Sequence, residues 1–245
     1  MGLNHDKLKQ RRAGNRTGTG WRPREGENRI RLLPPHSKYI NDWDALGDIA
    51  IAFKIHWFKM EGRPTEVSRC LEELTPKQVC PACQMWRQWR KSEDPGMKQM
   101  AKDIAPGDQY LFNVLDLNNL QAGIQSWSAN YTCWDKIMEV AANPAWGNIL
   151  DPANGIDFVI NMTPGTRSRT GYNQYGVTPN PQRTTVMDIL EAIPEWDAAL
   201  DSLENQISAP KTAEEIISLL EEIGFPPLPG RGGAAKPVAS AGGPA

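Results

Sequence analysis

Short runs of apolar residues, alternating with polar ones or rich in β-branched side chains, predict β-strands along much of the chain. Residues 28–35 (NRIRLLPP) alternate and stop at two prolines, and residues 48–58 (DIAIAFKIHWF) form a β-branched and aromatic run. Residues 109–117 and 123–128 predict the two strands of a hairpin, and residues 155–162 (GIDFVINM) predict a further strand. Such runs, when bounded by Gly, Pro or Asn, are typical of strands.

Helical spacing lies between and after these strands. One helix is predicted to begin directly after Cys83 and to continue, with one interruption, to about residue 102; a second covers residues 131–142. The sequence Thr-Ala-Glu-Glu at residues 212–215 has capping-box spacing and predicts an acidic helix ending at Gly224. Short strands with inserted helices predict a mainly β, α+β fold around a small barrel, rather than a parallel α/β sheet.

Composition places the chain among soluble proteins. It has 245 residues, of which 40% are hydrophobic and 23% charged, and no apolar run approaches the length of a membrane span. Residues 1–12 are polar and basic and lack the apolar core of a secretory signal, so we expect a cytoplasmic protein without membrane contact.

The net charge of −2 conceals a strong asymmetry. Residues 1–39 carry ten basic and three acidic residues, a balance of +7, whereas residues 188–222 carry ten acidic residues and one basic residue, a balance of −9. This split indicates a nucleic-acid-facing part and an acidic docking part, although solvated faces that merely segregate give the same pattern. Nine Trp, many beside basic residues, favour a single-strand-binding protein.

Cysteine and histidine spacing predicts a metal site. Cys70, Cys80 and Cys83 lie within fourteen residues, and His56 stands at the end of a predicted strand. A Cys-Pro-Ala-Cys turn lets two thiolates face one ion, and three Cys with one His form a closed tetrahedral zinc set. We therefore expect one structural Zn²⁺ with no open position for a catalytic water.

Other interpretations of these residues stay open. Cys80 and Cys83 have the spacing of a redox pair, although no βαβ pattern surrounds them and Cys70 would be left over. His36, after two prolines, is an alternative to His56 as the fourth ligand. Cys133 is interpreted as a buried core residue.

The metal segment, HWFKMEGRPTEVSRC followed by CPAC and MWRQW, resembles that of bacteriophage helix-destabilising proteins, the single-stranded DNA-binding proteins of the T-even type. Other segments agree in order: NRIRLLP, then GIQSWS before a helix, then DPANGIDFVINMTPGTRSRTGYNQYGV. The resemblance covers roughly residues 28–186, and its metal spacing is the specific part.

This resemblance implies an OB-fold core over residues 27–186 with a zinc subdomain at about 56–105. It further implies an acidic C-terminal region, residues 187–224, that contacts replication and recombination proteins. Residues 1–26 are Arg- and Gly-rich and are expected to be a flexible basic arm, and residues 225–245 a disordered tail. In this family the arm mediates cooperative head-to-tail self-association; the basic residues of this chain that approximate the arm motif are Lys9, Arg11, Arg12 and Arg16.

Single-stranded nucleic acid is held by basic groups that neutralise phosphates and by aromatic rings on which bases stack. The candidates in this chain are Lys54, Trp57 and Lys59 on the central strand, Arg87 and Arg90 after the cysteines, Trp127 in the hairpin, and Arg167, Arg169, Tyr172 and Tyr175 in a late basic loop. A short strand is expected after that loop, at residues 176–178. Arg29 and Arg31 are interpreted as exposed positions on the outer face of the first strand.

The expected function is sequence-non-specific binding of single-stranded DNA during phage replication, recombination and repair, in the cytoplasm of an infected bacterial host. The alternative is a zinc-ribbon module that binds RNA or docks to proteins. No P-loop, HExxH or Ser-His-Asp set is present, and His56 is followed by Trp57 and Phe58 instead of the Glu of a zinc deaminase. We therefore expect a binding protein and not an enzyme.

Overall fold

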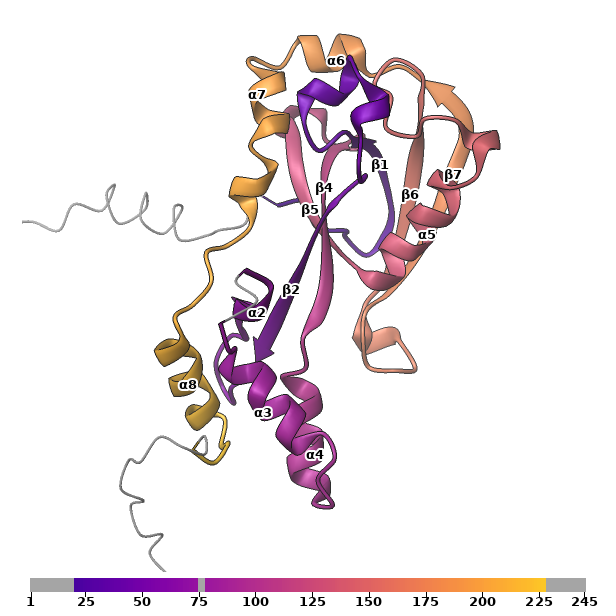
Figure 1. Ribbon diagram of the computed structural model, residues 1–245. Helices are drawn as coiled ribbons and strands as arrows, with labels where there is room; N and C mark the ends of the chain where they lie inside the picture. The colour runs from indigo at the N-terminus through magenta and orange to yellow at the C-terminus, as the bar shows by residue number, and fades with distance from the viewer. Residues whose placement is uncertain (1–19, 75–77, 228–245) are drawn as a thin grey trace, which may run out of the picture. The chain divides into compact units, whose positions relative to one another are not determined.

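The computed structural model describes residues 20–74 and 78–227 (Figure 1). Its strands are β1 (Gly26–Leu33), β2 (Ile51–Phe58), β3 (Glu66–Arg69), β4 (Gly107–Asp116), β5 (Ile124–Asn130), β6 (Gly155–Thr163) and β7 (Gln174–Thr184). Its α-helices are α2 (Leu71–Leu74), α3 (Pro81–Trp89), α4 (Pro95–Asp103), α5 (Tyr131–Ala141), α6 (Met187–Glu191), α7 (Trp196–Asp201) and α8 (Ala213–Glu222).

The described chain forms two compact units. The first, here called the sheet unit, contains the described residues up to Ile55 together with residues 107–210. The second, the metal unit, contains residues 56–106 and the described residues from Lys211 onward. The acidic region expected over residues 187–224 is thus divided between the units at Pro210.

Strand β4 is central to the sheet unit. Strand β2 pairs with its first half and β1 with its second half, whereas β5 pairs with residues 109–115 of β4, as expected for the hairpin. Strand β6 continues the sheet from β1, and β7 pairs with β6; all of these pairings are antiparallel. The predicted mainly β, OB-like fold with inserted helices is confirmed.

Strand β7 is longer than the sequence indicated. It covers residues 174–184 and not 176–178 alone, although Pro179 and Pro181 lie within it. Proline lacks the N–H that a ladder requires, which argues against a strand that continues through Pro179 and Pro181. The partner residues along β6 show that pairing continues past Pro179, with a register shift between Ile156 and Phe158.

The core of the sheet unit follows from the alternation of its strands. Ile30 and Leu32 of β1, Phe112 of β4 and Phe158 of β6 are all fully buried in one apolar cluster. Helix α5 covers this cluster through apolar residues that include Cys133, which is buried as expected. Burial of large apolar side chains of this kind supplies the main favourable free energy of folding.

Arg31 is buried, and its interpretation as an exposed residue was wrong. Its guanidinium lies 2.7 Å from the carboxylate of Asp157 and also donates to the carbonyl oxygens of Asp151 and Thr184. Arg29, half exposed, binds the other oxygen of the same carboxylate at 2.8 Å. This buried ion pair links β1 to β6 and to the end of β7.

The acidic helices bury their apolar faces within their own units. Leu190 of α6 and Leu200 of α7 pack in the sheet unit with Leu33 and Leu115.

None of the described helices is long and apolar enough to cross a membrane.

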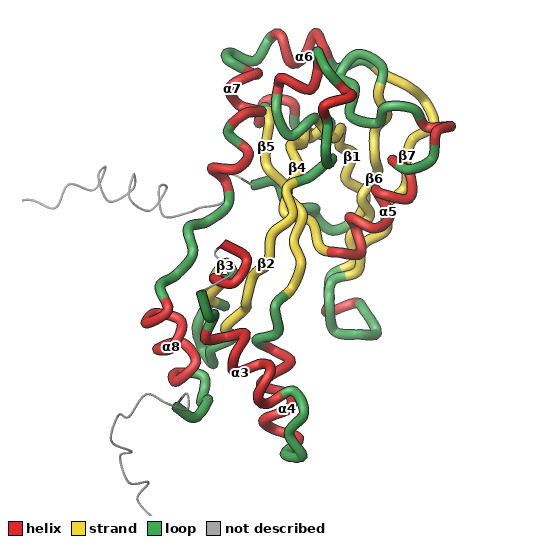
Figure 2. Tube along the Cα trace, in the orientation of Figure 1, coloured by secondary structure: helices red, strands yellow, loops and turns green. Residues whose placement is uncertain are grey.

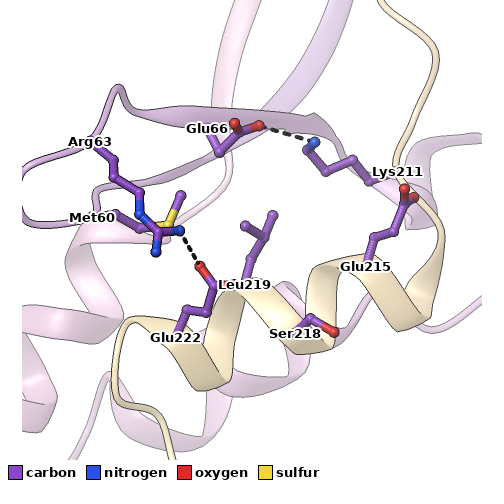
Figure 3. Close-up of a pocket in the computed structure, with 8 residues that line it drawn as sticks. All are labelled: Met60, Arg63, Glu66, Lys211, Glu215, Ser218, Leu219 and Glu222. Atoms are coloured by element: carbon purple, nitrogen blue, oxygen red, sulfur yellow. Dashed lines mark hydrogen bonds and ion pairs between the residues drawn. The ribbon is translucent and has the colours of Figure 1, made fainter.

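Helix α8 is an integral part of the metal unit. Ile216 and Leu220 lie in the same apolar cluster as Phe58, and Thr212 caps the helix through the predicted capping box. Two ion pairs flank a pocket beside the helix: Arg63 with Glu222 at 3.2 Å, and Lys211 with Glu66 at 3.0 Å (Figure 3).

Helix α3 begins one turn earlier than expected, at Pro81. Proline is well suited to the first helical position because its missing N–H has no partner there and its φ angle is already helical. The helix therefore starts inside the Cys-Pro-Ala-Cys turn. The expected interruption is also present, since α4 starts at Pro95 with Asp94 as its cap.

Removal of the buried carboxylate is expected to destabilise the sheet unit. Asp157→Ala leaves the guanidinium of Arg31 buried without its partner, and we expect a loss of about 3–5 kcal/mol in the free energy of unfolding. Urea denaturation followed by circular dichroism measures this loss.

The matched control for this prediction is Glu139→Gln, which breaks the exposed ion pair between Lys136 and Glu139 on α5. We expect the unfolding midpoint of the control to match that of the wild type. Equal midpoints for Asp157→Ala and Glu139→Gln would show that the buried pair does not support the fold.

Candidate metal centre and nucleic-acid interface

Four buried side chains of the metal unit converge on one point. His56 comes from β2, Cys70 follows β3, Cys80 precedes α3, and Cys83 lies in the first turn of α3. Their potential ligand atoms all lie within 4.8 Å of one another. The local fold explains this convergence, because the early start of α3 makes Cys80 its N-cap and Cys83 a residue of its first turn, and residues three apart lie on the same side of a helix.

The distances fit a tetrahedral ion. The Nε2 atom of His56 is 3.5 Å from the Sγ atoms of both Cys80 and Cys83, and the Sγ atoms of Cys70 and Cys83 are 3.5 Å apart. With zinc–sulfur and zinc–nitrogen bonds of about 2.3 and 2.0 Å, a tetrahedron has edges of about 3.8 Å between sulfurs and about 3.5 Å between sulfur and nitrogen. The group can thus hold one metal ion, and its donor set fits zinc.

A hydrogen bond sets the tautomer of His56. Its Nδ1 atom lies 2.7 Å from the carbonyl oxygen of Ile104, which can only accept, so Nδ1 carries the proton and donates. The other nitrogen, Nε2, is then the one that faces the three cysteines. Histidine ligands are commonly oriented in this way by a second hydrogen bond to a carbonyl oxygen.

Hydrogen bonds within the cluster shift the pKa values of His56 and Cys80. Burial lowers the pKa of His56, but hydrogen bonds to Cys70, Cys80 and the Ile104 carbonyl oxygen outweigh it and raise this pKa to about 9. Hydrogen bonds from the Cys70 and Cys83 thiols hold the pKa of Cys80 far below its usual range. A metal ion would bind the cysteines as thiolates and His56 through the unprotonated Nε2 atom.

The geometry decides between the alternatives that the sequence left open. His36 Nδ1 lies 2.9 Å from the carboxylate of Asp201, and His36 is not one of the four converging side chains. The third thiol, Cys70, is not left over as a redox pair would require. The cluster of His56 with three cysteines is the arrangement expected for a closed metal site.

Most candidate cations on β2 and in the metal unit have partners. Lys54 lies 2.5 Å from Asp108, and Lys59 lies 3.7 Å from Asp103. The guanidinium of Arg87 pairs with Glu72, which also accepts a hydrogen bond from the Cys80 backbone N–H. Each of these three ion pairs lies within one unit.

Aromatic candidates differ in their exposure. Arg90 lies over the ring of Trp86, with 4.8 Å between the guanidinium carbon and the ring centroid. Trp57 is half-buried on β2. Trp127 is only 3% exposed and packs between Trp21 and Phe112, so its assignment as a base-stacking residue is wrong.

The loop between β6 and β7 holds three of the candidates, and a fourth, Tyr175, follows in β7; Figure 2 shows the loop extending beyond the ends of the two strands. Tyr172 is 68% exposed, Arg167 and Arg169 are exposed, and Tyr175 is half-buried at the start of β7. The exposed phenol ring of Tyr172 is therefore accessible to a ligand.

The backbone of this loop is well fixed. The N–H of Gly165 donates to the side chain of Asn173 at 2.8 Å, and the N–H of Arg167 donates to the carbonyl oxygen of Pro164 at 2.9 Å. A Cβ atom on Gly165 would lie 2.5 Å from the carbonyl oxygen of Gly171, so this close approach requires glycine.

Sequence reasoning missed a second aromatic and basic surface on the sheet unit. Tyr110 stacks on Trp134 with ring centroids 4.3 Å apart, and the ring of Tyr131, 54% exposed, adjoins Trp134. The register of β2 and β4 places Lys54 opposite Asp108, so these two side chains share one face of the sheet. Tyr110 lies two residues after Asp108 on β4 and therefore lies on the same face as Lys54. The sequence contains a signal for this surface. Alternate residues of β4, such as Asp108 and Tyr110, share one face of the sheet, and Tyr131 and Trp134, three residues apart, share one face of α5.

The arm residues Lys9, Arg11, Arg12 and Arg16 lie outside the described residues. Their expected part in self-association therefore stays a prediction.

A family model described as gp32 DNA binding protein like matches residues 24–222. The match includes the metal ligands, the loop between β6 and β7, and the acidic helices. No curated protein matches the chain at a significant level.

Removal of one thiolate is expected to abolish metal binding. Cys83→Ser replaces a soft ligand by a hydroxyl in a closed four-ligand set, so we expect bound zinc to fall from about one equivalent to near zero after dialysis against a weak chelator. Elemental analysis of the purified chain measures the stoichiometry.

The matched control is Cys133→Ala, because Cys133 is equally buried but lies outside the cluster, and burial raises the pKa of its thiol to about 12. This control should retain the full metal content. A Cys83→Ser protein that keeps its zinc, or a wild type that carries none, would refute the site.

Proposed function

Since this chain belongs to the family of gp32-like DNA-binding proteins, we propose that it binds and coats single-stranded DNA without sequence preference. The observation that carries this proposal is the loop between β6 and β7. It offers two exposed guanidinium groups and an exposed phenol ring, those of Arg167, Arg169 and Tyr172, on a backbone held by internal hydrogen bonds. Phosphate neutralisation and base stacking are the two interactions that hold single strands.

Further contacts are proposed on both units. On the sheet unit, Lys54 with the aromatic residues Tyr110 and Tyr131 offers a second place for phosphate and base. The basic residues Lys59, Arg87 and Arg90 and the half-buried Trp57 are proposed to contribute further contacts. Tyr175, half-buried at the foot of the loop, is proposed to support the stacking position of Tyr172.

We infer that the metal ion is a single Zn²⁺ with a structural role. All four ligands are buried, and the same apolar cluster contains Ile216, Leu220 and Phe225 from the C-terminal part of the metal unit. The ion would therefore fix the core of this unit, and its loss would weaken DNA binding through unfolding rather than through a lost contact.

The wider role proposed is protection of single strands during replication, recombination and repair in the cytoplasm of a phage-infected bacterium. Exposed carboxylates on α6, α7 and α8 are proposed to dock replication and recombination proteins, since the apolar faces of these helices are already buried. The basic arm, with Lys9, Arg11, Arg12 and Arg16, is proposed to mediate cooperative self-association on DNA.

The proposal is tested by a side-by-side fluorescence titration with single-stranded DNA, duplex DNA and single-stranded RNA of equal length. We expect the tightest binding to single-stranded DNA, with an affinity that falls linearly on a logarithmic salt scale as counterions are released. Preference for RNA would favour the alternative of an RNA-binding module, and absence of binding to all three would leave a protein-docking module.

A single stacking residue is expected to carry a measurable share of the affinity. Tyr172→Ala removes an exposed ring, and we expect a loss of about 1–3 kcal/mol in the free energy of binding to single-stranded DNA. The same titration measures it. Tyr172→Phe, which keeps the ring, should bind as the wild type does.

Tyr39→Ala serves as a second control, because Tyr39 lies in the short 3₁₀ helix η1 (Ser37–Ile40), outside the proposed surface. We expect its affinity to be unchanged. A Tyr172→Ala protein with wild-type affinity would remove this loop from the binding surface.

A further inference from the structure

The Arg167 guanidinium is paired with a carboxylate of the same chain. Its partner is Glu25, which stands at the entrance to β1, more than one hundred residues earlier in the sequence. Both side chains are largely accessible to solvent, 71% exposed for Arg167 and 49% for Glu25. A phosphate can therefore reach the guanidinium, but it must compete there with the carboxylate.

The position of Glu25 is fixed by its neighbours. The side chain of Asn28, buried beside it, accepts a hydrogen bond from the Arg24 N–H at 2.8 Å and donates to the carbonyl oxygens of Arg24 and Gly26. It also donates to the carbonyl oxygen of Ile160 on β6 at 3.0 Å. The turn that carries Glu25 is thus attached to the strand that leads into the Arg167 loop.

The segment before this turn is anchored as well. Trp21 is 5% exposed, packs edge-on against Trp127 with centroids 5.2 Å apart, and donates its backbone N–H to the carbonyl oxygen of Ser126 at 2.6 Å. Glu25 and Arg167 therefore meet between two backbone segments that are each held by hydrogen bonds.

Carboxylates bind arginine with the same charge and the same oxygen geometry that phosphates use. We propose that Glu25 is an internal competitor of DNA phosphate at Arg167, an inference that rests on the proposed function of the loop. Glu25 occupies the guanidinium in the free protein, and a phosphate displaces it when a single strand binds. The carboxylate thereby lowers the affinity and keeps Arg167 oriented between binding events.

Pairing of other candidate cations is consistent with this view. Lys54 with Asp108, and Arg87 with Glu72, show the same arrangement of a basic candidate beside a carboxylate of its own unit. Glu25 differs from those partners because it is attached through Asn28 to the strand that leads into the loop.

The test is a double-mutant cycle on the full chain, measured by fluorescence titration with a single-stranded oligonucleotide at low and high salt. Glu25→Gln should raise the affinity about two- to fivefold at low salt, the range expected for an exposed ion pair, and less at high salt because the pair is screened. Arg167→Gln should lower the affinity and reduce the logarithmic salt slope by about 0.7, the value for one phosphate contact on a single strand.

The control is Glu27→Gln, an exposed position two residues away with no ion pair among the residues that the structure describes. It measures the gain from removing any negative charge near the loop. In the Arg167→Gln background, the gain from Glu25→Gln should shrink to that control value. Thermal unfolding of each variant confirms that the fold is kept.

Three results would overturn the inference. Equal gains from Glu25→Gln in both backgrounds would indicate a general charge effect, and an unchanged or lower affinity would show that Glu25 does not compete. A wild type that does not bind single-stranded DNA at all would overturn the proposed function as well. Wild-type binding without a Glu25 effect would leave that function intact.

Discussion

The buried ion pair between Arg31 and Asp157 determines how the sheet unit is put together. A guanidinium removed from water is tolerated only when its charge and its donors are satisfied. Here the carboxylate of Asp157 accepts two of those hydrogen bonds, and the carbonyl oxygens of Asp151 and Thr184 accept others. Because these acceptors come from β6, the turn before it and the end of β7, the pair fixes the hairpin that carries the loop at residues 164–173. Gly155 lies beside this pair, where a Cβ atom would lie 2.5 Å from the carbonyl oxygen of Asp151 and 3.2 Å from a guanidinium nitrogen of Arg31, so this close approach requires glycine.

The metal unit solves the same problem of stability by a different means. It contains two short residue ranges far apart in sequence, and its single apolar cluster includes the three cysteine ligands. A small unit of this kind has limited apolar surface to bury, and a bound ion adds folding free energy directly. Helix α8 completes the cluster, which gives the acidic helix a structural part in addition to any docking role. Charge removal on its exposed face, without deletion, is therefore the way to examine docking while the unit stays folded.

Much of the fold and of the metal site could be predicted from the sequence, because the signals are local. The spacing of His56 and the three cysteines reflects the chemistry of one ion, and the strand alternation gave the hairpin of β4 and β5. The errors came from contacts that are distant in sequence. Arg31 was expected to be exposed because its partner, Asp157, lies far away in sequence on β6. Trp127 was expected to be accessible because its neighbours Ser126 and Ser128 are polar, but their side chains lie on the opposite face of the strand. Tyr110 was missed for the converse reason, since its exposed face depends on the register with β2.

The loop between β6 and β7 is the proposed principal contact with single-stranded DNA, and hydrogen exchange measures that contact residue by residue. Exchange followed by mass spectrometry, with and without a saturating single-stranded oligonucleotide, reports which backbone N–H groups become protected. We expect protection over residues 163–176, where the N–H groups of Gly165, Arg167 and Gly171 form the loop's internal hydrogen bonds. We expect unchanged exchange in α8, whose backbone is held within the metal unit. Bound DNA that leaves residues 163–176 unprotected would contradict the account.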